Sequence, residues 1–362
     1  MNKLFALLLT SSFMHLVGCD QTTPQSMGTV LGESDTQYSQ VKPSTQISFP
    51  EDHQAHNQYR HEWWYLTANL TDKNGKDIGM QWTQFRFAVA PPKDGTKKSN
   101  AWRSQQVYMA HSAVTTAQVH YADEKWSRGQ KQLAGVESEP FRVFLDDWQW
   151  RSSSTDMFPA TLEASSDQFG YQLVLTSDAP YQKQGNQGYS EKSADGSVAS
   201  HYYSQPFISV EGTVTIDGVT HQVTGDGWID REWSSQFLLD SQQGWDWFAL
   251  RLDEDTTMVL FQLRDSKSGK ASYNHARIMY RDGHHLDIEP NEMALEPIKN
   301  TNVEGRSYPT EWRLAIPSQE LQIELSAINS KAKMPLNVAY WEGPVLFKGT
   351  HSGKGYMELT GY

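Results

Sequence analysis

The chain has 362 residues, of which 12% are aromatic, and a formal net charge of −12. The length favours two domains over one, and the aromatic content favours strands over helices. The negative charge, with no block of Lys or Arg, argues against nucleic acid as a partner.

The first segment, residues 1–18, has the pattern of a secretory signal peptide. Lys3 gives a charged start, Leu4–Val17 form an apolar run too short to span a membrane, and Leu16–Cys19 resembles the lipobox of bacterial lipoproteins. Cys19 is the single cysteine, so an internal disulfide is excluded and we expect this residue to be lipidated. A plain signal peptide with an incidental cysteine is the alternative.

The segment after the cleavage site predicts how the protein is held at a membrane. Several acyl chains on Cys19 would anchor it stably, whereas one chain would be marginal. Loss of Lys3 with the signal peptide takes the net charge from −12 to −13. Asp20 resembles the enterobacterial signal for retention at the inner membrane, with the outer membrane as the alternative. We expect an exported lipoprotein on the periplasmic side, with residues 19–44, poor in large apolar side chains, as a lipidated flexible tether.

Short runs of alternating polarity follow, joined by Gly, Asn and Asp turns. Asn74-Gly75 and Asp217-Gly218 predict hairpin turns, and the polar stretch Lys183–Ser200 predicts a long loop or lid. The predicted strands are His61–Leu70, Ile78–Val89, Val107–Val114, Phe141–Trp150, Leu162–Ala164, Tyr171–Thr176, Ile208–Ile216, His221–Thr224, Trp247–Leu252, Met258–Arg264, Ala276–Tyr280, Trp312–Ile316, Leu321–Ala327 and Tyr356–Thr360. The pattern shows no amphipathic helix longer than about ten residues, so we expect an all-β sandwich or barrel.

An internal echo predicts two copies of one β unit. The pattern WxYL followed by MxxxQFR within residues 63–86 corresponds to WxWF followed by MxxxQLR within residues 245–264. A repeat offset by about half the mature chain predicts an N-terminal domain, 45–236, and a C-terminal domain, 237–362. Chance similarity between two aromatic hairpins is the alternative.

Several familiar site types lack their sequence signatures. His53, His56 and His61 lie close together, but without an HExxH or paired CxxC elements, so we expect no metal site. The chain has no GxSxG elbow for a serine triad. It also lacks both glycine-rich phosphate loops, so we expect no nucleotide and no other cofactor.

The segment Asp226–Gln236, DGWIDREWSSQ, combines three carboxylates, one arginine and two tryptophans. In an extended strand the side chains at 226, 228, 230 and 232 share one face, and those at 227, 229, 231 and 233 the other. A carboxylic acid in an aromatic pocket has a raised pKa and can donate a proton, and aromatic faces can stabilise a carbocation. A paired structural network between the domains or at a barrel mouth, in which Arg231 bridges to an acid such as Glu62, is the alternative.

These considerations give two sets of candidate residues. The catalytic candidates are Asp230, Glu232, Asp226 and His111, and for His111 a satisfied core histidine is the alternative. The ligand-binding candidates are Glu62, Trp63, Trp64, Tyr65, Tyr202, Tyr203, Trp228, Arg231 and Trp233.

Seven segments resemble the carotenoid 1,2-hydratase family, also described as AttH-like or hydroxyneurosporene-synthase-like lipocalin proteins. They are HEWWYLTANL, YMAHSAVT, YYSQPFISVEGTV, GDGWIDREWSSQ, GWDWFALRL, YWEGPVLFKGT and GYMELTGY, from about residue 50 to the end. The resemblance implies a tandem of two lipocalin-like antiparallel β-barrels. Barrels of about eight strands can hold one small ligand.

One position departs from the hydratases of that family. Their Asp-His-x-Trp pattern, whose histidine and tryptophan are implicated in adding water across a terminal prenyl double bond, reads Asp230-Arg231-Glu232-Trp233 here. Trp233 carries over, but Arg231 stays protonated and cannot exchange a proton as histidine does. Hydratase chemistry would rely on Asp226, Asp230, Glu232 or His111 instead.

Three functional hypotheses follow. We expect a membrane-anchored protein that binds a hydrophobic, isoprenoid or lipid-derived small molecule in an aromatic-lined cavity. The alternative is a carotenoid-1,2-hydratase-like hydro-lyase, or a hydrolase-like enzyme, that uses carboxylates as acid and base. In the third hypothesis the acids and Arg231 only clamp the two barrels together.

Overall fold

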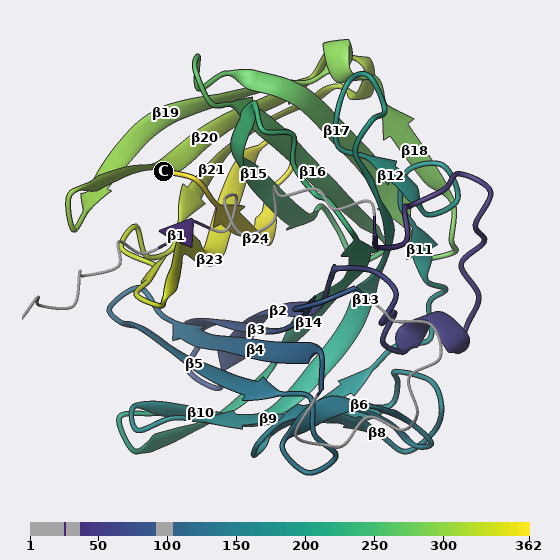
Figure 1. Cartoon of the computed structure of the whole chain (residues 1–362). Helices are drawn as coiled ribbons and strands as arrows, with labels where there is room; N and C mark the ends of the chain where they lie inside the picture. Colours follow the sequence, from purple (N-terminus) through teal and green to yellow (C-terminus); the bar gives the residue numbers. More distant parts are fainter. Residues whose placement is uncertain (1–24, 27–36, 92–103) are drawn as a thin grey trace, which may run out of the picture.

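The computed structural model describes residues 25–26, 37–91 and 104–362. The predicted signal peptide, 1–18, and Cys19 lie outside these residues. Nearly all of the described elements are strands, which form two curled sheets that face each other (Figure 1). Apart from the two-residue strand β1 (Gln25–Ser26), all strand pairs are antiparallel, so the predicted all-β, barrel-like class is confirmed.

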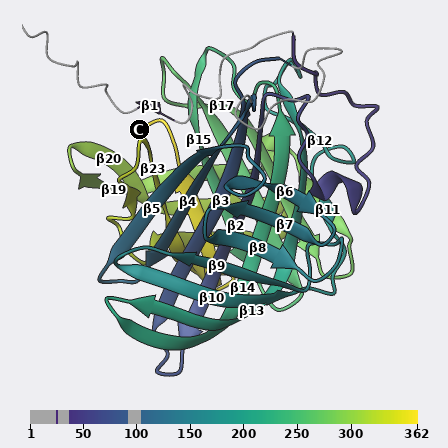
Figure 2. The ribbon, with the colours of Figure 1, turned by 60° about the horizontal axis from the view of Figure 1, so that its bottom comes forward.

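The N-terminal sheet has the strand order β5-β4-β3-β2-β14-β13-β10-β9-β8-β7-β6, and β11 and β12 also pair with β13. Figure 2 shows these strands side by side. Their bounds are β2 (His61–Asp72), β3 (Asp77–Ala88), β4 (Gln106–Thr115), β5 (His120–Arg128), β6 (Ala134–Ser138), β7 (Phe141–Leu145), β8 (Trp148–Ser152), β9 (Ala160–Ser165), β10 (Phe169–Thr176), β11 (Gln182–Lys183), β12 (Tyr189–Glu191), β13 (Ala199–Ile216) and β14 (Val219–Ser234).

The C-terminal sheet has the order β18-β17-β16-β15-β24-β23-β21-β20-β19, and β1 and β22 also pair with β23. Its strands are β15 (Gln242–Arg251), β16 (Thr256–Asp265), β17 (Ala271–Tyr280), β18 (His285–Ile288), β19 (Ala294–Val303), β20 (Arg306–Ile316), β21 (Leu321–Ala327), β22 (Lys333–Met334), β23 (Val338–Gly349) and β24 (Gly353–Leu359). In the described part of the chain, short 3₁₀ helices accompany the sheets: η1 (Glu51–His53), η3 (Pro290–Glu292) and η4 (Pro317–Gln319). No helix in the described part of the chain is long and apolar enough to cross a membrane.

The two echo segments occupy equivalent places in the two sheets. β2 and β3 form the first hairpin of the N-terminal sheet, and β2 pairs with β14, the last strand of that sheet. β15 and β16 form the corresponding hairpin, and β15 pairs with β24, the last strand of the chain. The chain changes from one sheet to the other between Ser234 and Gln242. The domain bounds 45–236 and 237–362 stay a prediction.

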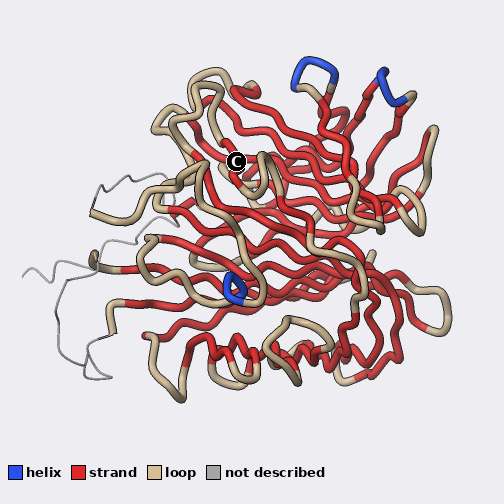
Figure 3. The backbone as a smooth tube through the Cα atoms, turned by 90° about the vertical axis from the view of Figure 1, so that its right-hand side faces the viewer, coloured by secondary structure: helices blue, strands red, loops and turns tan. Residues whose placement is uncertain are grey.

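Each sheet curls around a core of its own, and a further set of apolar side chains lies between the sheets. The tube view shows one group of strands above the other (Figure 3). Tryptophans 64, 82, 148, 150 and 233 fill the interior of the N-terminal sheet. Tyr65 and Trp228 from this sheet contact Trp247, Ala249 and Tyr356 of the other, so the seam between the sheets is itself an aromatic layer.

The stretch Lys183–Ser200, predicted as a long loop or lid, is more ordered than its composition suggested. β11 and β12 pair with β13, and Arg277 of β17 donates hydrogen bonds to the carbonyl oxygens of Lys183 and Gly185, the latter at 2.8 Å. The segment therefore lies across the seam. It is held by hydrogen bonds of its backbone, which a polar sequence can form as well as an apolar one.

Candidate functional site

The site is built from the alternation of side chains along β14. Asp230 lies opposite Tyr65 of β2 and Ser204 of β13, and Glu232 lies opposite Trp63 and Tyr202. These side chains face the C-terminal sheet. Ile229 and Trp233, one residue out of phase, pack into the interior of the N-terminal sheet. The predicted division of this segment into two faces is confirmed.

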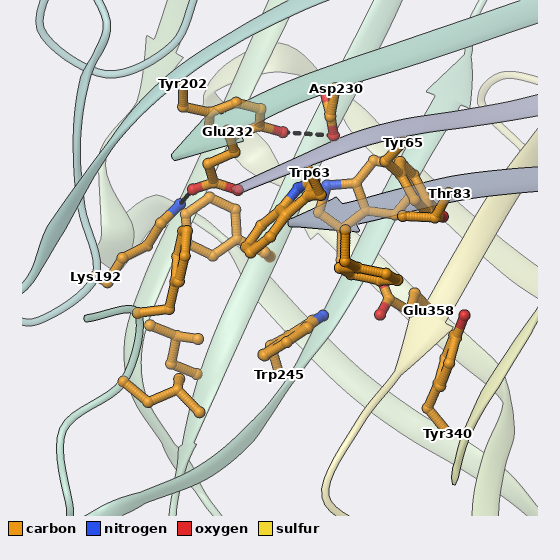
Figure 4. Close-up of a pocket in the computed structure, with 16 residues that line it drawn as sticks. Trp63, Tyr65, Thr83, Lys192, Tyr202, Asp230, Glu232, Trp245, Tyr340 and Glu358 are labelled. Atoms are coloured by element: carbon orange, nitrogen blue, oxygen red, sulfur yellow. Dashed lines mark hydrogen bonds and ion pairs between the residues drawn. The ribbon is translucent and has the colours of Figure 1, made fainter. Parts of the chain in front are cut away.

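A cavity lies between the two sheets, with about 720 Å³ of space between its lining atoms, part of it open to solvent. Both sheets supply walls, and Figure 4 shows ten of the lining side chains labelled. The residues that line it are Trp63, Tyr65, Thr83, Phe85, Lys192, Tyr202, Asp230, Glu232, Phe237, Leu238, Trp245, Trp247, Phe261, Leu263, Tyr340 and Glu358. The walls are thus mainly aromatic, interrupted by three carboxyl groups and one ammonium group.

Asp230 is a buried acid without a cation beside it among the described residues. Its carboxyl group accepts hydrogen bonds from the Tyr202 hydroxyl at 2.7 Å, from the Trp228 indole N–H at 2.8 Å and from the Ser204 hydroxyl. These donors favour the ionised form, but burial outweighs them and raises the pKa of Asp230 from 3.8 to about 7. This carboxyl group can therefore exchange a proton near neutral pH.

Glu232 differs from Asp230 because it has a cationic partner. The Lys192 ammonium lies 2.7 Å from its Oε1 atom, and the Ser200 hydroxyl donates to the same oxygen (Figure 4). Lys192 also lies over the rings of Tyr202 and Phe261, at 4.9 and 4.5 Å from their centres. Glu232 is therefore engaged in an ion pair with Lys192, whereas Asp230 has only neutral hydrogen-bond donors.

The C-terminal sheet contributes a second pair of carboxyl groups. Glu342 of β23 and Glu358 of β24 are direct cross-strand partners. Glu342 is fully buried and accepts a hydrogen bond from the Tyr65 hydroxyl at 2.6 Å, whereas Glu358 is partly exposed to the cavity. Burial raises the pKa of both groups; the charge of Glu358 adds to this at Glu342, and the charges of Asp230 and Glu232 add to it at Glu358.

The opposite face of β14 carries a buried network in which one carboxylate pairs with two guanidinium groups. Arg231 lies 2.5 Å from Glu62, whose other oxygen pairs with Arg86. Arg231 also stacks over the Trp64 ring at 3.8 Å. Although burial alone would raise it, the two guanidinium groups hold the pKa of Glu62 below its usual range. The Arg231–Glu62 pairing that we offered as the alternative is present in the structure.

Comparison with known proteins shows the family of the chain. The sequence model of the AttH-like family matches residues 40–362. The chain belongs to the AttH-like family. An AttH-type protein from Nitrosomonas europaea is similar in structure, with a TM-score of 0.77 and 30% identity over 90% of this chain and 99% of that one. No curated protein matches the chain in sequence.

Two more distant structures share the fold of this AttH-like protein. Kievitone hydratase from Nectria haematococca has a TM-score of 0.64 and 14% identity, covering 91% of this chain and 96% of that one. CghA has a TM-score of 0.50 and 12% identity, covering 90% and 97%. At these identities the likeness concerns the fold alone.

The structure sorts the predicted residues of this AttH-like protein into three places. Asp230, Glu232, Trp63, Tyr65 and Tyr202 line the cavity, and Trp228 lies beside it as a donor to Asp230. Glu62, Trp64, Tyr203, Arg231 and Trp233 are buried inside the N-terminal sheet instead. Each of them is the direct sequence neighbour of a cavity residue on β2, β13 or β14. Because side chains alternate along a strand, each therefore points away from the cavity. His111 is buried behind Tyr340.

Asp226 shares the face of Asp230 but not its surroundings. It lines a smaller cleft of about 300 Å³ at another part of the seam, together with Trp228, Arg251 and Lys354. Its side chain is 62% exposed, and the Arg251 guanidinium lies 3.6 Å away. The structure therefore separates this catalytic candidate from the aromatic cavity.

The clamp hypothesis for Arg231 is wrong. Its hydrogen bonds go to Glu62 and to the carbonyl oxygens of Gln54 and Trp63, all in the N-terminal half of the chain. Other side chains cross the seam. Tyr65 bonds Glu342, Lys354 bonds Asp77, and Arg251 donates to the Pro206 carbonyl oxygen at 2.9 Å.

Sequence reasoning did not single out Lys192, Tyr340, Glu342 or Glu358. Glu342 and Glu358 lie in YWEGPVLFKGT and GYMELTGY, where an acid among aromatic residues repeats the pattern of HEWWY. That pattern was the available signal. Lys192 lies in a polar stretch, where no sequence pattern indicated a site. Across residues 25–26, 37–91 and 104–362, no group of three His, Cys, Asp or Glu side chains is placed to hold a metal ion.

Proposed function

We propose that this AttH-like protein binds a hydrophobic, isoprenoid or lipid-derived small molecule in the cavity between the sheets and transfers protons to it as a hydro-lyase does. The observation that carries the proposal is the pair of carboxyl groups of Asp230 and Glu358. They come from facing sheets, and among the described residues neither forms an ion pair. Carboxyl groups that titrate near neutral pH in an aromatic cavity are suited to general acid–base chemistry.

The surroundings of the two acids differ, and the difference suggests their roles. Asp230 accepts hydrogen bonds from three donors, which favour its carboxylate form. Glu358 lies beside Glu342; burial and the charges of Asp230 and Glu232 disfavour its carboxylate form, and a single donor, Trp245, favours it. We assign Glu358 as the proton donor and Asp230 as the base.

The proposed reaction adds one water to a carbon–carbon double bond. The proton of Glu358 bonds to one alkene carbon, and the cation that forms on the other carbon is stabilised by the faces of Trp63, Trp245 and Trp247. Water bonds to that carbon, and Asp230 takes the proton that water loses. Kievitone hydratase, a structure of the same fold, shows by its name that this fold serves a hydratase.

Labelled water tests the reaction. Purified protein is incubated with geraniol, farnesol or lycopene in water labelled with heavy oxygen, and products are examined by mass spectrometry. We expect incorporation of the label by the wild type and none by Asp230→Asn or Glu358→Gln, although both variants still bind. Asp226→Asn is the matched control and should retain turnover, because its side chain lies outside the cavity. A wild type that never incorporates the label would remove the hydro-lyase assignment.

Binding without catalysis is the second candidate function. It is favoured by the Lys192–Glu232 ion pair, which leaves the cavity close to neutral when Asp230 and Glu358 are protonated. A neutral aromatic cavity suits an uncharged apolar ligand. Saturable quenching of tryptophan fluorescence by the same compounds, without label incorporation, would support this function. Absence of quenching would contradict both candidates.

We also propose, from the sequence, that the protein is exported and held at the periplasmic side of a membrane through lipidated Cys19. Metabolic labelling with a radioactive fatty acid should mark the wild type and leave Cys19→Ser unlabelled. The unlabelled variant should also appear in the soluble periplasmic fraction. Equal labelling of both proteins would exclude this residue as the lipid attachment point.

A further inference from the structure

We propose that Tyr340, His111 and Glu124 form a proton path from the cavity to the outer edge of the N-terminal sheet. The proposal deepens the proposed function, and rests on it, because it explains how a cavity acid regains its proton. When an apolar ligand fills the cavity, it separates Glu358 from bulk solvent even with one reacting water bound at Asp230, so the proton that Glu358 regains needs another route. The path would be such a route through protein groups.

The cavity end of the path is Tyr340. Its side chain lines the cavity near Glu358 (Figure 4), and its strand, β23, also carries Glu342. Tyr340 lies two residues before Glu342 on β23, and Glu358 is the cross-strand partner of Glu342, so both carboxyl groups share the face of the sheet that carries Tyr340. Burial raises the pKa of Tyr340, and the charges of both glutamates add to this. The hydroxyl oxygen lies 2.9 Å from Nδ1 of His111, and the two rings stack with their centres 5.6 Å apart.

The middle of the path is His111, which is completely buried on β4. Its Nε2 atom lies 3.6 Å from an oxygen of Glu124 on the edge strand β5. Both of these atoms are buried, and neither has a conventional hydrogen-bond partner among the described residues. Burial lowers the pKa of His111, and Glu124 opposes that shift, so the imidazole is neutral and can both accept and donate a proton.

The outer end is Glu124, whose side chain is 16% exposed. Its other oxygen accepts hydrogen bonds from the backbone N–H and the side-chain amide of Asn337, which precedes β23. The carboxyl group is thereby held toward His111 while it still meets solvent. The path thus crosses the seam, with His111 and Glu124 from one sheet and Tyr340 and Asn337 from the other.

The transfer moves one proton without net chemistry. Glu124 takes a proton from solvent and gives it to Nε2 of His111. The proton on Nδ1 of His111 then passes to the Tyr340 oxygen. The Tyr340 O–H proton passes in turn to the carboxylate of the Glu342–Glu358 pair. His111 changes tautomer in this transfer, and exchange of its ring protons must restore the Nδ1–H form before the next one. His111 and Glu124 are positioning residues in this scheme, since they act through Tyr340.

A substrate-free experiment tests the path separately from the proposed function. The cavity is filled with the uncharged fluorophore N-phenyl-1-naphthylamine, whose binding is followed by its emission. A light-triggered acid jump then protonates the carboxyl groups, and time-resolved infrared spectroscopy follows the carbonyl band that Glu358→Gln or Glu342→Gln removes. Wild-type protonation should be equally fast with and without the fluorophore.

The decisive variant is His111→Gln, because glutamine can bond both neighbours but cannot relay a proton. With the fluorophore bound, it should slow protonation by roughly a hundredfold, the lower range of what a positioned proton carrier contributes. Tyr340→Phe and Glu124→Gln should slow it as well, and His284→Gln, at an exposed position, should not. Equal rates in wild type and His111→Gln, or a wild type slowed by the fluorophore, would overturn the path.

Turnover gives an independent readout. If the labelled-water reaction is found, His111→Gln should lower kcat with little change in KM and should shift its pH profile. If no turnover is found while the acid jump shows the His111-dependent rate, the proposed function fails and the proton path stands. Turnover with an unchanged rate and pH profile in His111→Gln would remove the path and leave the proposed function.

Discussion

The two faces of β14 carry charge in opposite ways. On the inner face, Glu62 of the neighbouring β2 contacts the guanidinium groups of Arg86 and Arg231. On the outer face, Asp230 has hydrogen-bond donors but no cation among the described residues. The pKa of Glu62 is lowered and that of Asp230 is raised, although both side chains are buried. Burial alone therefore does not separate a structural acid from a reactive one.

Compensation of charge makes the difference. A buried carboxylate with two cations is a fixed anion, and removing any partner leaves an unpaired charge. A buried carboxyl group with only neutral donors stays near its titration point and can change its charge at little cost. On this comparison the inner network stabilises the fold. The acids that face the cavity region without a cation, Asp230, Glu342 and Glu358, are available for chemistry. Four substitutions test the distinction, from the largest expected effect to the smallest.

Glu62→Gln should give the largest loss of stability. It leaves Arg86 and Arg231 buried without a counter-charge, so the free energy of unfolding should fall by about 3–5 kcal/mol. Because the folded pKa of Glu62 is depressed, its contribution is present above its unfolded pKa of 4.5 and is lost as pH falls below that value. Urea unfolding at pH 7 measures the effect. A loss below about 1 kcal/mol would contradict the structural role of the inner face.

Asp230→Asn should change the pH dependence of stability. The folded pKa, about 7, exceeds the unfolded value, 3.8, so the folded protein binds the extra proton between these values and wild-type stability falls as pH rises. Asparagine cannot titrate. Relative to wild type, the variant should gain up to roughly 4 kcal/mol between pH 4 and pH 8. Parallel urea titrations at both pH values measure this difference, and a constant difference would mean that Asp230 is ionised throughout.

Glu342→Gln should stabilise the protein modestly at alkaline pH. The substitution removes one of two acids that lie directly opposite each other on β23 and β24. Relief of like-charge repulsion across a strand pair contributes up to about 1 kcal/mol. Glutamine still accepts the hydrogen bond from Tyr65. Because the folded pKa of Glu342 is raised, the wild type loses stability as pH rises above the unfolded value of 4.5, so the gain should grow from pH 5 to pH 9. A pH-independent change would indicate packing rather than charge.

The sequence allowed the strand content and the alternation on β14 to be predicted, because both depend on local patterns. The hairpin turns at Asn74-Gly75 and Asp217-Gly218 join β2 to β3 and β13 to β14 as expected. Alternation could not tell which face of β14 meets the other sheet. Trp64 and Trp233 were therefore grouped with Trp63 and Tyr202 as ligand contacts, although they fill the interior.

The missing site residues depend on pairings between distant segments. Glu342 and Glu358 become partners only through the register of β23 with β24, and they meet Tyr65 only through packing of the two sheets. Lys192 reaches Glu232 because the segment after β12 folds back beside β13. None of these contacts has a short-range sequence pattern, and so residue spacing gave no indication of them.

Asp226→Asn should have the smallest effect, and it tests whether position on a face is enough to make an acid reactive. Asp226 lies on the same strand and face as Asp230, but its side chain is 62% exposed and its contact with Arg251 is long, at 3.6 Å. Water screens such a pair, so the free energy of unfolding should change by less than about 0.5 kcal/mol. Affinity for N-phenyl-1-naphthylamine should be unchanged, since the fluorophore would occupy the other cavity. If this variant instead lost binding or turnover as Asp230→Asn does, the smaller cleft would belong to the site, and an uncompensated buried charge would not be the property that defines it.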